Sequence, residues 1–583
     1  MKKILFLIFL FEFFFFNFSF SDTHYVSKTG SSIPPYDSWA TAADSIWKAI
    51  DVADFWDTVR VGSGTYKENV VLKTGHSLIG AGWDSTTIDA TGLGQYLVRL
   101  ADSSSIEGFY LIARPDDGIS VLGLNVSSTI IRKNKITAYQ SFGIELSGAK
   151  GSIVKDNMIF NCYGGIVVDY YSSVLIEDNY FEDNPIASNY FCSLWILNNI
   201  FDTKASSPAA DIRYGDTLVI KNNVIFNHKT GSVFAFQVGL DIGPPDSIMN
   251  NVVAGETNPK PFSHGVVIAD TNNKIVCINN IVTGFDNGFD GGIIYSDCIM
   301  SYNDAWGNNI NYHNVDPDTG NISADPMFVY PDSDFHLQKY SPCIDTGDPN
   351  ILDKDGTRSD IGAYGGPLGQ SYTYLDYPPK APDSLDASFD SISINLTWKP
   401  NTEADLSYYL VYKDTVFNFI PDTFKIVGIV SKDSSMFKDY NWEYGKTYYY
   451  KLSAYDLTNH QSPYSEELMI KATDVPWTDE IKVEIEKYSL SQNYPNPFNP
   501  VTTICYYIPD IGPKPAKVEI IIYNLLGSKI RTLVSEYKYP GEYRVVWDGR
   551  DDSGKDVSSG IYFYRMLIWG SEFSKAKKMI LVR

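Results

Sequence analysis

The sequence predicts an all-β protein, in which a long solenoid of stacked β coils is followed by two immunoglobulin-like β-sandwich domains. The first observation is an Asn-x-[Ile/Val/Phe] unit that recurs every 20 to 29 residues, at Asn134, Asn157, Asn179, Asn199, Asn223, Asn251 and Asn280. Such a period is typical of solenoids, whose coils bury their apolar faces only by stacking. The second observation is that residues 381–474 and 488–583 consist of short alternating runs between Gly, Asp, Ser and Pro turns, a pattern that indicates β-sandwiches.

Residues 1–21 have the organisation of a secretory signal peptide. Lys2 and Lys3 precede an apolar run from Ile4 to about Phe16, and small residues precede the expected cleavage after Ser21. The apolar run is shorter than the roughly 20 residues of a membrane-spanning helix. No later segment is long and apolar enough to span either, so we expect no transmembrane segment in the mature chain.

The solenoid is expected to occupy residues 22–367. Residues 38–53 have apolar side chains at helical spacing, and we expect them to form the domain's one helix, because a solenoid needs its open end covered. The runs between the Asn corners are short and alternating, without a helical period. Asn tolerates the left-handed conformation of a sharp bend, and stacked Asn side chains can form a hydrogen-bonded ladder, so we interpret these Asn residues as structural.

Segments at both ends of this region carry a family resemblance. Residues 57–61, 64–68 and 78–82 near the beginning, and residues 325–328, 341–345 and 360–364 near the end, match the first and closing coils of secreted bacterial β-helices. The region thereby resembles the right-handed parallel β-helix proteins of the pectate-lyase-like superfamily. The resemblance implies that fold for residues 22–367, but it implies no particular chemistry.

One motif invites comparison with polygalacturonase-type hydrolases. Ser263-His264-Gly265 is similar to their Gly/Ser-His-Gly motif, and Asp116 and Asp117 are similar to their paired carboxylates. Inverting hydrolysis needs these groups within one or two coils. The Asp pair and His264 are 147 residues apart, or roughly 29 Å along the solenoid at a strand spacing of about 4.8 Å. We therefore reject this constellation and interpret His264 as a surface or turn residue.

A lyase is the enzymatic alternative. Elimination from a uronic acid needs a cation to neutralise the carboxylate and a Lys or Arg base. Arg213 and Lys221 are the candidate catalytic residues, and Asp211 and Asp216 the candidate metal ligands, because all four fall within one coil. Ordinary solvated charges at the corners and outer faces of a solenoid are the favoured explanation of these residues. No recognisable spacing of acidic ligands supports calcium, so no cofactor is expected.

Residues 381–474 follow a Gly/Pro-rich linker, 368–380, and precede a polar connector, 475–487. Runs around Trp398, Tyr408–Tyr412 and Tyr448 give this segment the strand pattern of a sandwich. It resembles a fibronectin type III domain, in which Trp398 would be the buried core Trp and Tyr448 the tyrosine corner. A spacer role is favoured over specific binding.

The last domain, 488–583, carries several separated motifs. They are Tyr494, Pro495, Asn496, Pro497, Phe498, Asn499 and Pro500; then Trp547, Asp548 and Gly549; then Gly560, which opens a Gly-Ile-Tyr-Phe-Tyr run. Together they closely resemble the type A C-terminal sorting domain of the type IX secretion system. The resemblance implies export through the periplasm to the medium or to the outer-membrane surface of a Gram-negative bacterium, with the type IX machinery as a partner.

Charge and cysteine content limit the partners. The net charge of −23 argues against nucleic acid and against anionic membranes. Six cysteines are few for an exported chain of this size, and none has zinc-finger spacing. Cys277 and Cys298 are 21 residues apart, near one coil period, so they form either a disulfide between adjacent coils or a pair of stacked thiols.

Two functions of different classes remain open from the sequence. The favoured one is a non-catalytic surface protein that binds extracellular polysaccharide, or mediates adhesion, through a lateral groove and exposed aromatic side chains. The alternative is a polysaccharide-degrading enzyme, most plausibly a lyase acting on acidic glycans. Fold alone licenses neither activity.

Overall fold

The computed structural model describes residues 21–91, 94–113, 118–203, 209–212, 215–226, 234–239, 246–256, 259, 261–269, 275–291, 298–389, 393–443, 445–472, 488–509, 515–571 and 573–582. The chain divides into two compact units. The first comprises residues 1–381, 401–408 and 454–463, and the second comprises 382–400, 409–453 and 464–583. The predicted signal peptide, apart from Ser21, and the connector 475–487 lie outside the described residues.

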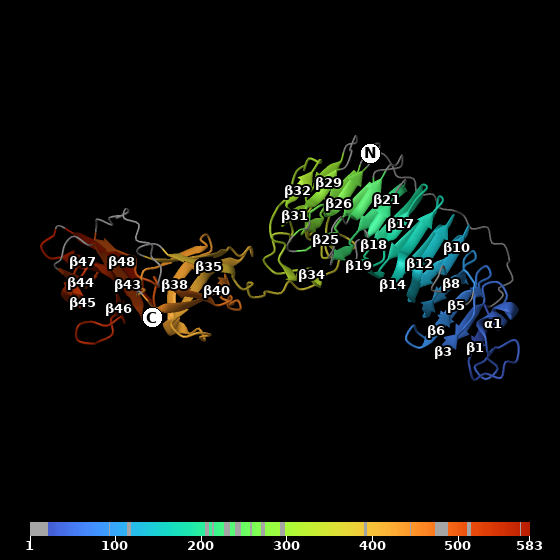
Figure 1. Ribbon diagram of the computed structural model, residues 1–583, viewed down its shortest axis with the longest axis horizontal. Helices are drawn as coiled ribbons and strands as arrows, with labels where there is room; N and C mark the ends of the chain where they lie inside the picture. Colours follow the sequence, from blue (N-terminus) through green and yellow to red (C-terminus); the bar gives the residue numbers. More distant parts are fainter. Residues whose placement is uncertain are drawn as a thin grey trace. The chain divides into compact units, whose positions relative to one another are not determined.

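The first unit is built on a parallel β-helix, whose strands run side by side from the blue end to the green end in Figure 1. One sheet holds twelve parallel strands, one per coil: β1 (Thr23–Val26), β2 (Thr58–Val61), β5 (Ser77–Gly80), β8 (Ser105–Glu107), β11 (Ile130–Arg132), β13 (Lys150–Lys155), β15 (Ser173–Glu177), β18 (Cys192–Leu197), β21 (Gly215–Lys221), β24 (Asp246–Met249), β27 (Ile275–Ile278) and β30 (Ile299–Ser301). The solenoid prediction is confirmed.

The other twenty strands of the solenoid form a second parallel sheet of two columns. The first column comprises β3 (Gly64–Tyr66), β6 (Thr86–Asp89), β9 (Tyr110–Ile112), the first parts of β12 (Lys135–Ser147) and β14 (Met158–Asp169), β16 (Tyr180–Glu182), β19 (Ile200–Asp202), β22 (Val224–Phe226), β25 (Val252–Ala254), β28 (Ile281–Thr283) and β31 (Asp304–Trp306). The second column comprises β4 (Val70–Val71), β7 (Tyr96–Arg99), β10 (Ile119–Leu124), the last parts of β12 and β14, β17 (Ile186–Ser188), β20 (Ala210–Ile212), β23 (Phe234–Gly239), β26 (His264–Ala269), β29 (Asn287–Gly291) and β32 (Ile310–His313).

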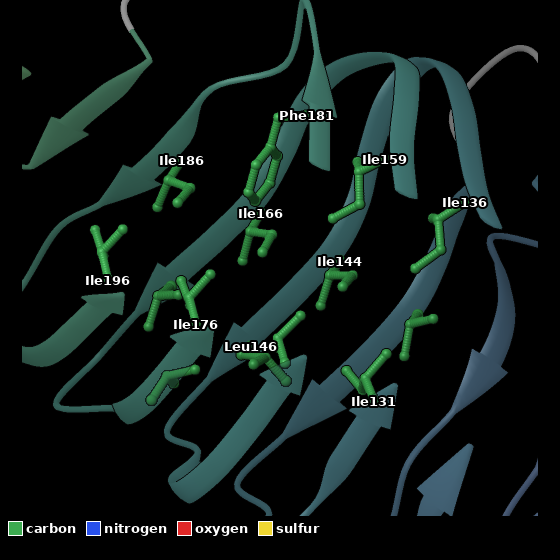
Figure 2. Close-up of a cluster of buried hydrophobic side chains, with 14 of the residues drawn as sticks. Ile131, Ile136, Ile144, Leu146, Ile159, Ile166, Ile176, Phe181, Ile186 and Ile196 are labelled. Carbon is green, nitrogen blue, oxygen red and sulfur yellow. The ribbon is translucent and has the colours of Figure 1, made fainter. Parts of the chain in front are cut away.

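Stacked aliphatic side chains fill the interior of the solenoid. Strand alternation sends every second side chain inward, and register pairing sets each one against its equivalent in the next coil. Ile136, Ile159 and Phe181 are one such stack, and all three are fully buried. Figure 2 shows these stacks converging from the twelve-stranded sheet and from the two columns of the second sheet. Each coil therefore depends on its neighbours for burial, as expected for a solenoid.

The recurring asparagines form a buried ladder at the corner between the twelve-stranded sheet and the first column. Asn179 represents the pattern: its Nδ2 donates to the Val154 and Glu177 carbonyls, and its Oδ1 accepts the backbone N–H of Asn157 at 2.9 Å. The same hydrogen bonds to the Oδ1 atom of the next ladder Asn continue toward the C-terminal coils, through Asn303 to Asn321. The structural interpretation of these residues is confirmed.

The bend itself, however, belongs to the preceding residue. Asp156 and Asp178 have φ of 56° and 55°, and Asn222 and Asn250 have φ of 58° and 52°, whereas the ladder Asn that follows each of them has no positive φ. The expectation that the ladder Asn takes the left-handed conformation was wrong. The ladder Asn must point inward to reach its partners, so the residue before it makes the turn.

A short helix packs on the first coil, but it begins later than predicted. Helix α1 spans Ile46–Val52 and buries Ile46, Ala49 and Ile50, whereas residues 38–45 form turns. Ser45 provides no side-chain cap. Instead the Glu68 carboxylate accepts the backbone N–H groups of Ile46 and Trp47, each at 2.9 Å, and so satisfies two of the unpaired donors at the helix start.

The end of the solenoid region differs from the predicted closing coils. Residues 325–365, which we call the closing segment, contain an antiparallel hairpin, β33 (Phe328–Tyr330) with β34 (Asp334–Leu337), followed by turns. Phe335, Leu337 and Ile361 pack against the outer side of β22, β25 and β28 rather than stacking as further coils. The resemblance located this segment correctly but did not predict its antiparallel course.

Two pairs of antiparallel sheets follow, which confirms the all-β prediction. The first pair is ordered β35-β36-β39 and β38-β37-β40-β41, with β35 (Asp383–Phe389), β36 (Ile394–Lys399), β37 (Leu406–Asp414), β38 (Ile426–Ser431), β39 (Met436–Asp439), β40 (Thr447–Asp456), β41 (Leu468–Lys471) and a 3-10 turn, η1 (Thr423–Lys425). Trp398 is buried against Tyr409, and the Tyr448 hydroxyl accepts the Glu443 N–H at 2.8 Å. Both contacts suit the expected core Trp and tyrosine corner.

The second pair is ordered β42-β43-β46 and β45-β44-β47-β48. Its strands are β42 (Ser489–Leu490), β43 (Thr502–Ile508), β44 (Ala516–Asn524), β45 (Lys529–Lys538), β46 (Gly541–Trp547), β47 (Gly560–Ile568) and β48 (Ser574–Leu581). Inward residues of both sheets, including Ile504, Ile520 and Met566, form one core.

The cysteines are free thiols in this structure. Cys277 and Cys298 do lie on adjacent coils, and contact with Cys298 together with burial raises the pKa of the Cys277 thiol well above its usual value. Of the two arrangements considered, the structure has the stacked thiols. Within the described part of the chain, no helix has the length and hydropathy needed to cross a membrane.

Candidate functional site

The outer face of the first column carries a continuous row of side chains, one per coil, which we call the outward row. Register pairs align nine residues in this row: Tyr110, Lys135, Met158, Tyr180, Ile200, Val224, Val252, Ile281 and Asp304. The residue after each of them points into the solenoid core. The solvent exposure of the row differs along its length, because the closing segment covers only its last part.

In the covered half, the protein's own chain occupies the row. Val224, Val252 and Ile281 are at most 6% exposed, because Phe335, Leu337 and Ile361 of the closing segment pack on them. The corner asparagines hold the closing segment by its backbone. Asn222 Nδ2 donates to the carbonyls of Ala363 (2.8 Å) and Gly365 (2.7 Å), and Asn250 Nδ2 donates to that of Asp360 (3.0 Å).

In the open half, the row forms the floor of a groove of about 600 Å³. Its lining combines aromatic, aliphatic and polar side chains: Trp83, Met158, Tyr180 and Ile200, with Asp156, Asp178 and Asn198 at the corner beside the ladder residues Asn157 and Asn179. Ile200 is 41% exposed. The lining extends from the turn after β5 to the turn after β18, five strand steps or about 24 Å. We call this region the lateral groove.

A second line of outward residues flanks the floor. Phe160, Glu182 and Asp202 are paired on β14, β16 and β19, and the Tyr180 hydroxyl donates to Asp202 Oδ2 at 3.1 Å. Further along, Lys135 Nζ lies 5.3 Å from the ring centre of Tyr110 and 5.1 Å from that of Phe160. The groove therefore offers ring faces and aliphatic surface beside hydrogen-bonding carboxylates, the combination that suits small polar ligands with apolar faces.

The charged side chains that line the groove are acidic. Lys155 Nζ lies 2.9 Å from both Glu177 and Asp178, and hydrogen bonds to these two carboxylates raise the pKa of Lys155. This ammonium group is thus already paired. Asp156 adds a further carboxylate to the lining, so the groove is better suited to a neutral ligand than to an anionic one.

Exposed aromatic pairs also occur at a different corner, between β14 and β15 and between β17 and β18. Tyr170 stacks on Tyr190 with ring centres 4.9 Å apart, and Tyr171 stacks on Phe191 at 5.6 Å. The four side chains are 38% to 60% exposed. Each ring uses one face on its partner, so these pairs stabilise the turns and leave less ring face for a ligand.

His264 lies in a side-chain cluster on the second column, which corrects its interpretation as a surface or turn residue. It sits on strand β26, with 16% of its side chain exposed. Its Nδ1 is 2.6 Å from Asp290 Oδ2, and Nδ1 of His313, one coil beyond Asp290, is 2.8 Å from Asp290 Oδ1. The Asn309 amide and the Phe262 N–H lower the pKa of nearby Asp286. No motif in the sequence indicated that Asp290 and His313 share this face.

Two of the four lyase candidates, Asp211 and Lys221, lie on different sheets. Asp211 is on β20, in the second column, whereas Lys221 ends β21 in the other sheet, so most of β21, roughly 20 Å, separates them. Burial lowers the pKa of Lys221. Asp216 lies on β21, and Arg213 falls outside the described residues, as do Asp116 and Asp117.

The sorting-motif residues converge on one end of the last sandwich. Phe498 and Trp547 are buried with ring centres 5.5 Å apart, and Trp547 meets Tyr562 at 5.2 Å. The Phe498 N–H donates to the Ile580 carbonyl on β48 (3.0 Å). Of the remaining residues in the first motif, Tyr494 is 56% exposed, and Asn499 and Pro500 are also exposed. The peptide bonds before Pro495 and Pro497 are cis, and Asn496 Oδ1 accepts the Ile580 N–H. In the later motifs, Asp548 pairs with Arg531, Gly549 has φ of 70°, and Gly560 begins β47.

The groove residues themselves were missed by sequence reasoning, although a signal existed. Each ladder Asn is followed by an outward residue, so Met158, Tyr180 and Ile200 are the first residues after the repeat unit's Asn. Trp83 lies several coils away and gave no such signal.

Comparisons with known proteins support the fold and leave the chemistry open. A family model described as a right-handed β-helix region matches residues 85–242, which contain most of the lateral groove. No curated protein matches the chain.

Similar solved structures align only in part. The spore cortex lytic enzyme SleM of Clostridium perfringens is 22% identical, with 20% of this chain and 34% of that chain covered and a TM-score of 0.14. An Fn3-like protein from Clostridium thermocellum is 23% identical, with 17% and 98% covered and a TM-score of 0.15. Dimeric latent PorU from Porphyromonas gingivalis is 14% identical, with 35% and 20% covered and a TM-score of 0.16. This chain thus spans about a third of the length of the first.

Proposed function

We propose that the β-helix binds a polysaccharide chain in the lateral groove. The observation that carries the proposal is that three apolar or aromatic residues of the outward row, Met158, Tyr180 and Ile200, line an open groove. An exposed apolar strip of this kind on a regular solenoid marks a binding surface. Sugar rings have apolar faces that pack on Trp and Tyr, and hydroxyl groups that donate to carboxylates.

The covered half suggests which chemistry the open half takes. Where the closing segment lies on the row, the corner residues are Asn222 and Asn250, which donate to carbonyl groups. In the lateral groove the equivalent corner residues include Asp156 and Asp178, which only accept hydrogen bonds when ionised. A ligand rich in donors, such as the hydroxyl groups of a neutral glycan, fits these acceptors, whereas a uronic acid polymer would meet like charge.

A polysaccharide array tests this proposal. The intact protein is expected to retain neutral glycans in preference to acidic ones. Tyr180→Ala, and separately Trp83→Ala, should weaken retention about tenfold, since an aromatic contact contributes up to about 1.5 kcal/mol and about 1.4 kcal/mol corresponds to a factor of ten. Tyr190→Ala is the matched control, an exposed Tyr at the other corner. Equal loss in Tyr190→Ala, or no retained glycan at all, would contradict the groove.

Degradation of the glycan is the second candidate, and the His264–Asp290–His313 cluster favours it. A carboxylate that orients an imidazole is a common arrangement for a general base. If the protein is a hydrolase, new reducing ends should appear during incubation and disappear in His264→Ala. If it is a lyase, unsaturated products should absorb in the ultraviolet and depend on Arg213 or Lys221. Absence of degradation across a broad panel of polysaccharides would exclude both the hydrolase and the lyase activity.

We also propose that the chain is exported by a type IX secretion system and displayed or released outside a Gram-negative cell. The separated motifs of 488–583 support this, since Phe498, Trp547 and the last strand build one local structure. Deletion of 488–583 should leave the protein in the periplasm. Normal surface delivery of that truncated form, checked by protease accessibility on intact cells, would refute the route.

A further inference from the structure

A cluster of three potential metal ligands lies outside the lateral groove, where the linker meets the turn after β40. Asp376, Asp456 and His460 each offer one ligand atom, and these atoms lie within 4.8 Å of one another. Nδ1 of His460 is 3.0 Å from Asp456 Oδ2 and 3.8 Å from Asp376 Oδ1. Bonds of 2.0–2.1 Å to a tetrahedral ion place ligand atoms roughly 3.3 Å apart, between these two distances. All three residues belong to the first compact unit.

Backbone donors already satisfy part of the cluster. The N–H groups of Thr458 and His460 both donate to Asp456 Oδ1 at 2.8 Å. The Thr458 hydroxyl lies 3.2 Å from Asp376 Oδ2, 2.9 Å from Asp456 Oδ1 and 3.2 Å from His460 Nδ1, and its single proton can serve only one of them. Asp456 Oδ2 and Asp376 Oδ1 both face His460 Nδ1, and a cation between these three atoms would offset the repulsion between the two carboxylates.

A fourth carboxylate gives an independent indication of a ligand. Asp405 is 3% exposed, and its Oδ2 accepts no hydrogen bond from the described residues. The Asp405 backbone carbonyl accepts the Leu457 N–H at 2.9 Å, which fixes Asp405 against the turn that carries Asp456 and His460. An orphaned buried carboxylate oxygen is costly unless something binds it.

We infer that Asp376, Asp456 and His460, with Asp405 beside them, bind a divalent cation of the zinc type. One imidazole nitrogen among carboxylate oxygens suits zinc, whereas calcium prefers oxygen ligands alone and more of them. The ion would fasten linker residue Asp376 to the turn that follows β40. The site does not depend on the proposed glycan groove.

The chain provides a matched control for an ordinary histidine–aspartate pair. Nδ1 of His336 lies 2.6 Å from Asp334 Oδ1. His336 and Asp334 thus share the imidazole–carboxylate contact, but they are not among the groups of three potential ligands found in the described residues. His336→Gln should therefore leave zinc binding unchanged.

Calorimetric titration of the metal-stripped, full-length protein with ZnCl₂, in excess Mg²⁺ to suppress unspecific binding, tests the inference. One saturable site is expected. Asp376→Asn and His460→Gln should each weaken it at least tenfold; both side chains are partly exposed, so these variants should fold, as circular dichroism can check. Absence of a saturable site, or equal affinity in His460→Gln, overturns the inference. Saturable Ca²⁺ binding that ignores His460→Gln overturns the zinc-type assignment.

Discussion

The two halves of the outward row have the same position in every coil but different surroundings. From Val224 to Ile281 the row is covered by the protein's own closing segment, and from Tyr110 to Ile200 it is open. The corner residues change in part, from Asn222 and Asn250 to Asp156 and Asp178, whereas Asn198 keeps an amide in the open half. The covered half shows how this surface holds a chain: an apolar floor with hydrogen bonds from the corner. The open half retains the floor and replaces the amide with a carboxylate at two corners.

The largest expected effect lies in the covered half. Phe335→Ala removes the ring that packs between the closing segment and the row, and it should lower the free energy of unfolding by about 3–5 kcal/mol. Calorimetric melting of the intact protein measures this. Tyr330→Ala, at a 58% exposed position in the same hairpin, should change stability little. Similar losses in both variants would mean that the closing segment does not depend on this contact.

Asp304 extends the comparison, because it follows Ile281 in the outward row, is fully buried, and accepts a hydrogen bond from the Cys343 thiol of the closing segment at 3.2 Å. Burial raises its pKa from 3.8 to about 7. The native state then holds the proton more tightly than the unfolded state, so this stabilisation is complete below pH 3.8 and is lost as the pH rises to about 7. The loss amounts to at most about 4 kcal/mol. Asp304→Asn should remove this pH dependence and raise the pH 8 melting temperature, and an unchanged pH profile would contradict the assignment.

Exchange of the corner residues tests the hydrogen-bonding sense directly. Asn250→Asp replaces a donor with a carboxylate facing the Asp360 carbonyl and should cost about 2–3 kcal/mol in denaturant unfolding. The converse change in the open half, Asp178→Asn, loses only a partly exposed ion pair with Lys155 and should cost less than about 1 kcal/mol. Comparable costs at the two corners would show that they are equivalent.

Much of the fold was predictable from the sequence because it is periodic. The Asn repeat, with β-branched runs between its members, specifies coil length, ladder and core together. The two sandwiches were predictable from their turns and from Trp398, Tyr448, Phe498 and Trp547, all of which pack inside their domains. Local periodicity of this kind needs no knowledge of distant contacts.

The rest depends on contacts that the period does not encode. The closing segment departs from the coil pattern because residues 325–365 bury their apolar side chains on the outside of earlier coils. The groove depends on where that cover stops, and Trp83 reaches it from several coils away. The His264–Asp290–His313 cluster likewise joins three coils through side chains that are 26 and 23 residues apart in the sequence.

Binding at the open half is the central claim, and one titration tests it most directly. The neutral glycan best retained on the array is titrated calorimetrically into the intact protein, Tyr180→Ala and Tyr190→Ala. We predict about tenfold weaker binding for Tyr180→Ala, with melting within about 1 kcal/mol of the parent, and unchanged binding for Tyr190→Ala. Full affinity in Tyr180→Ala would contradict the account.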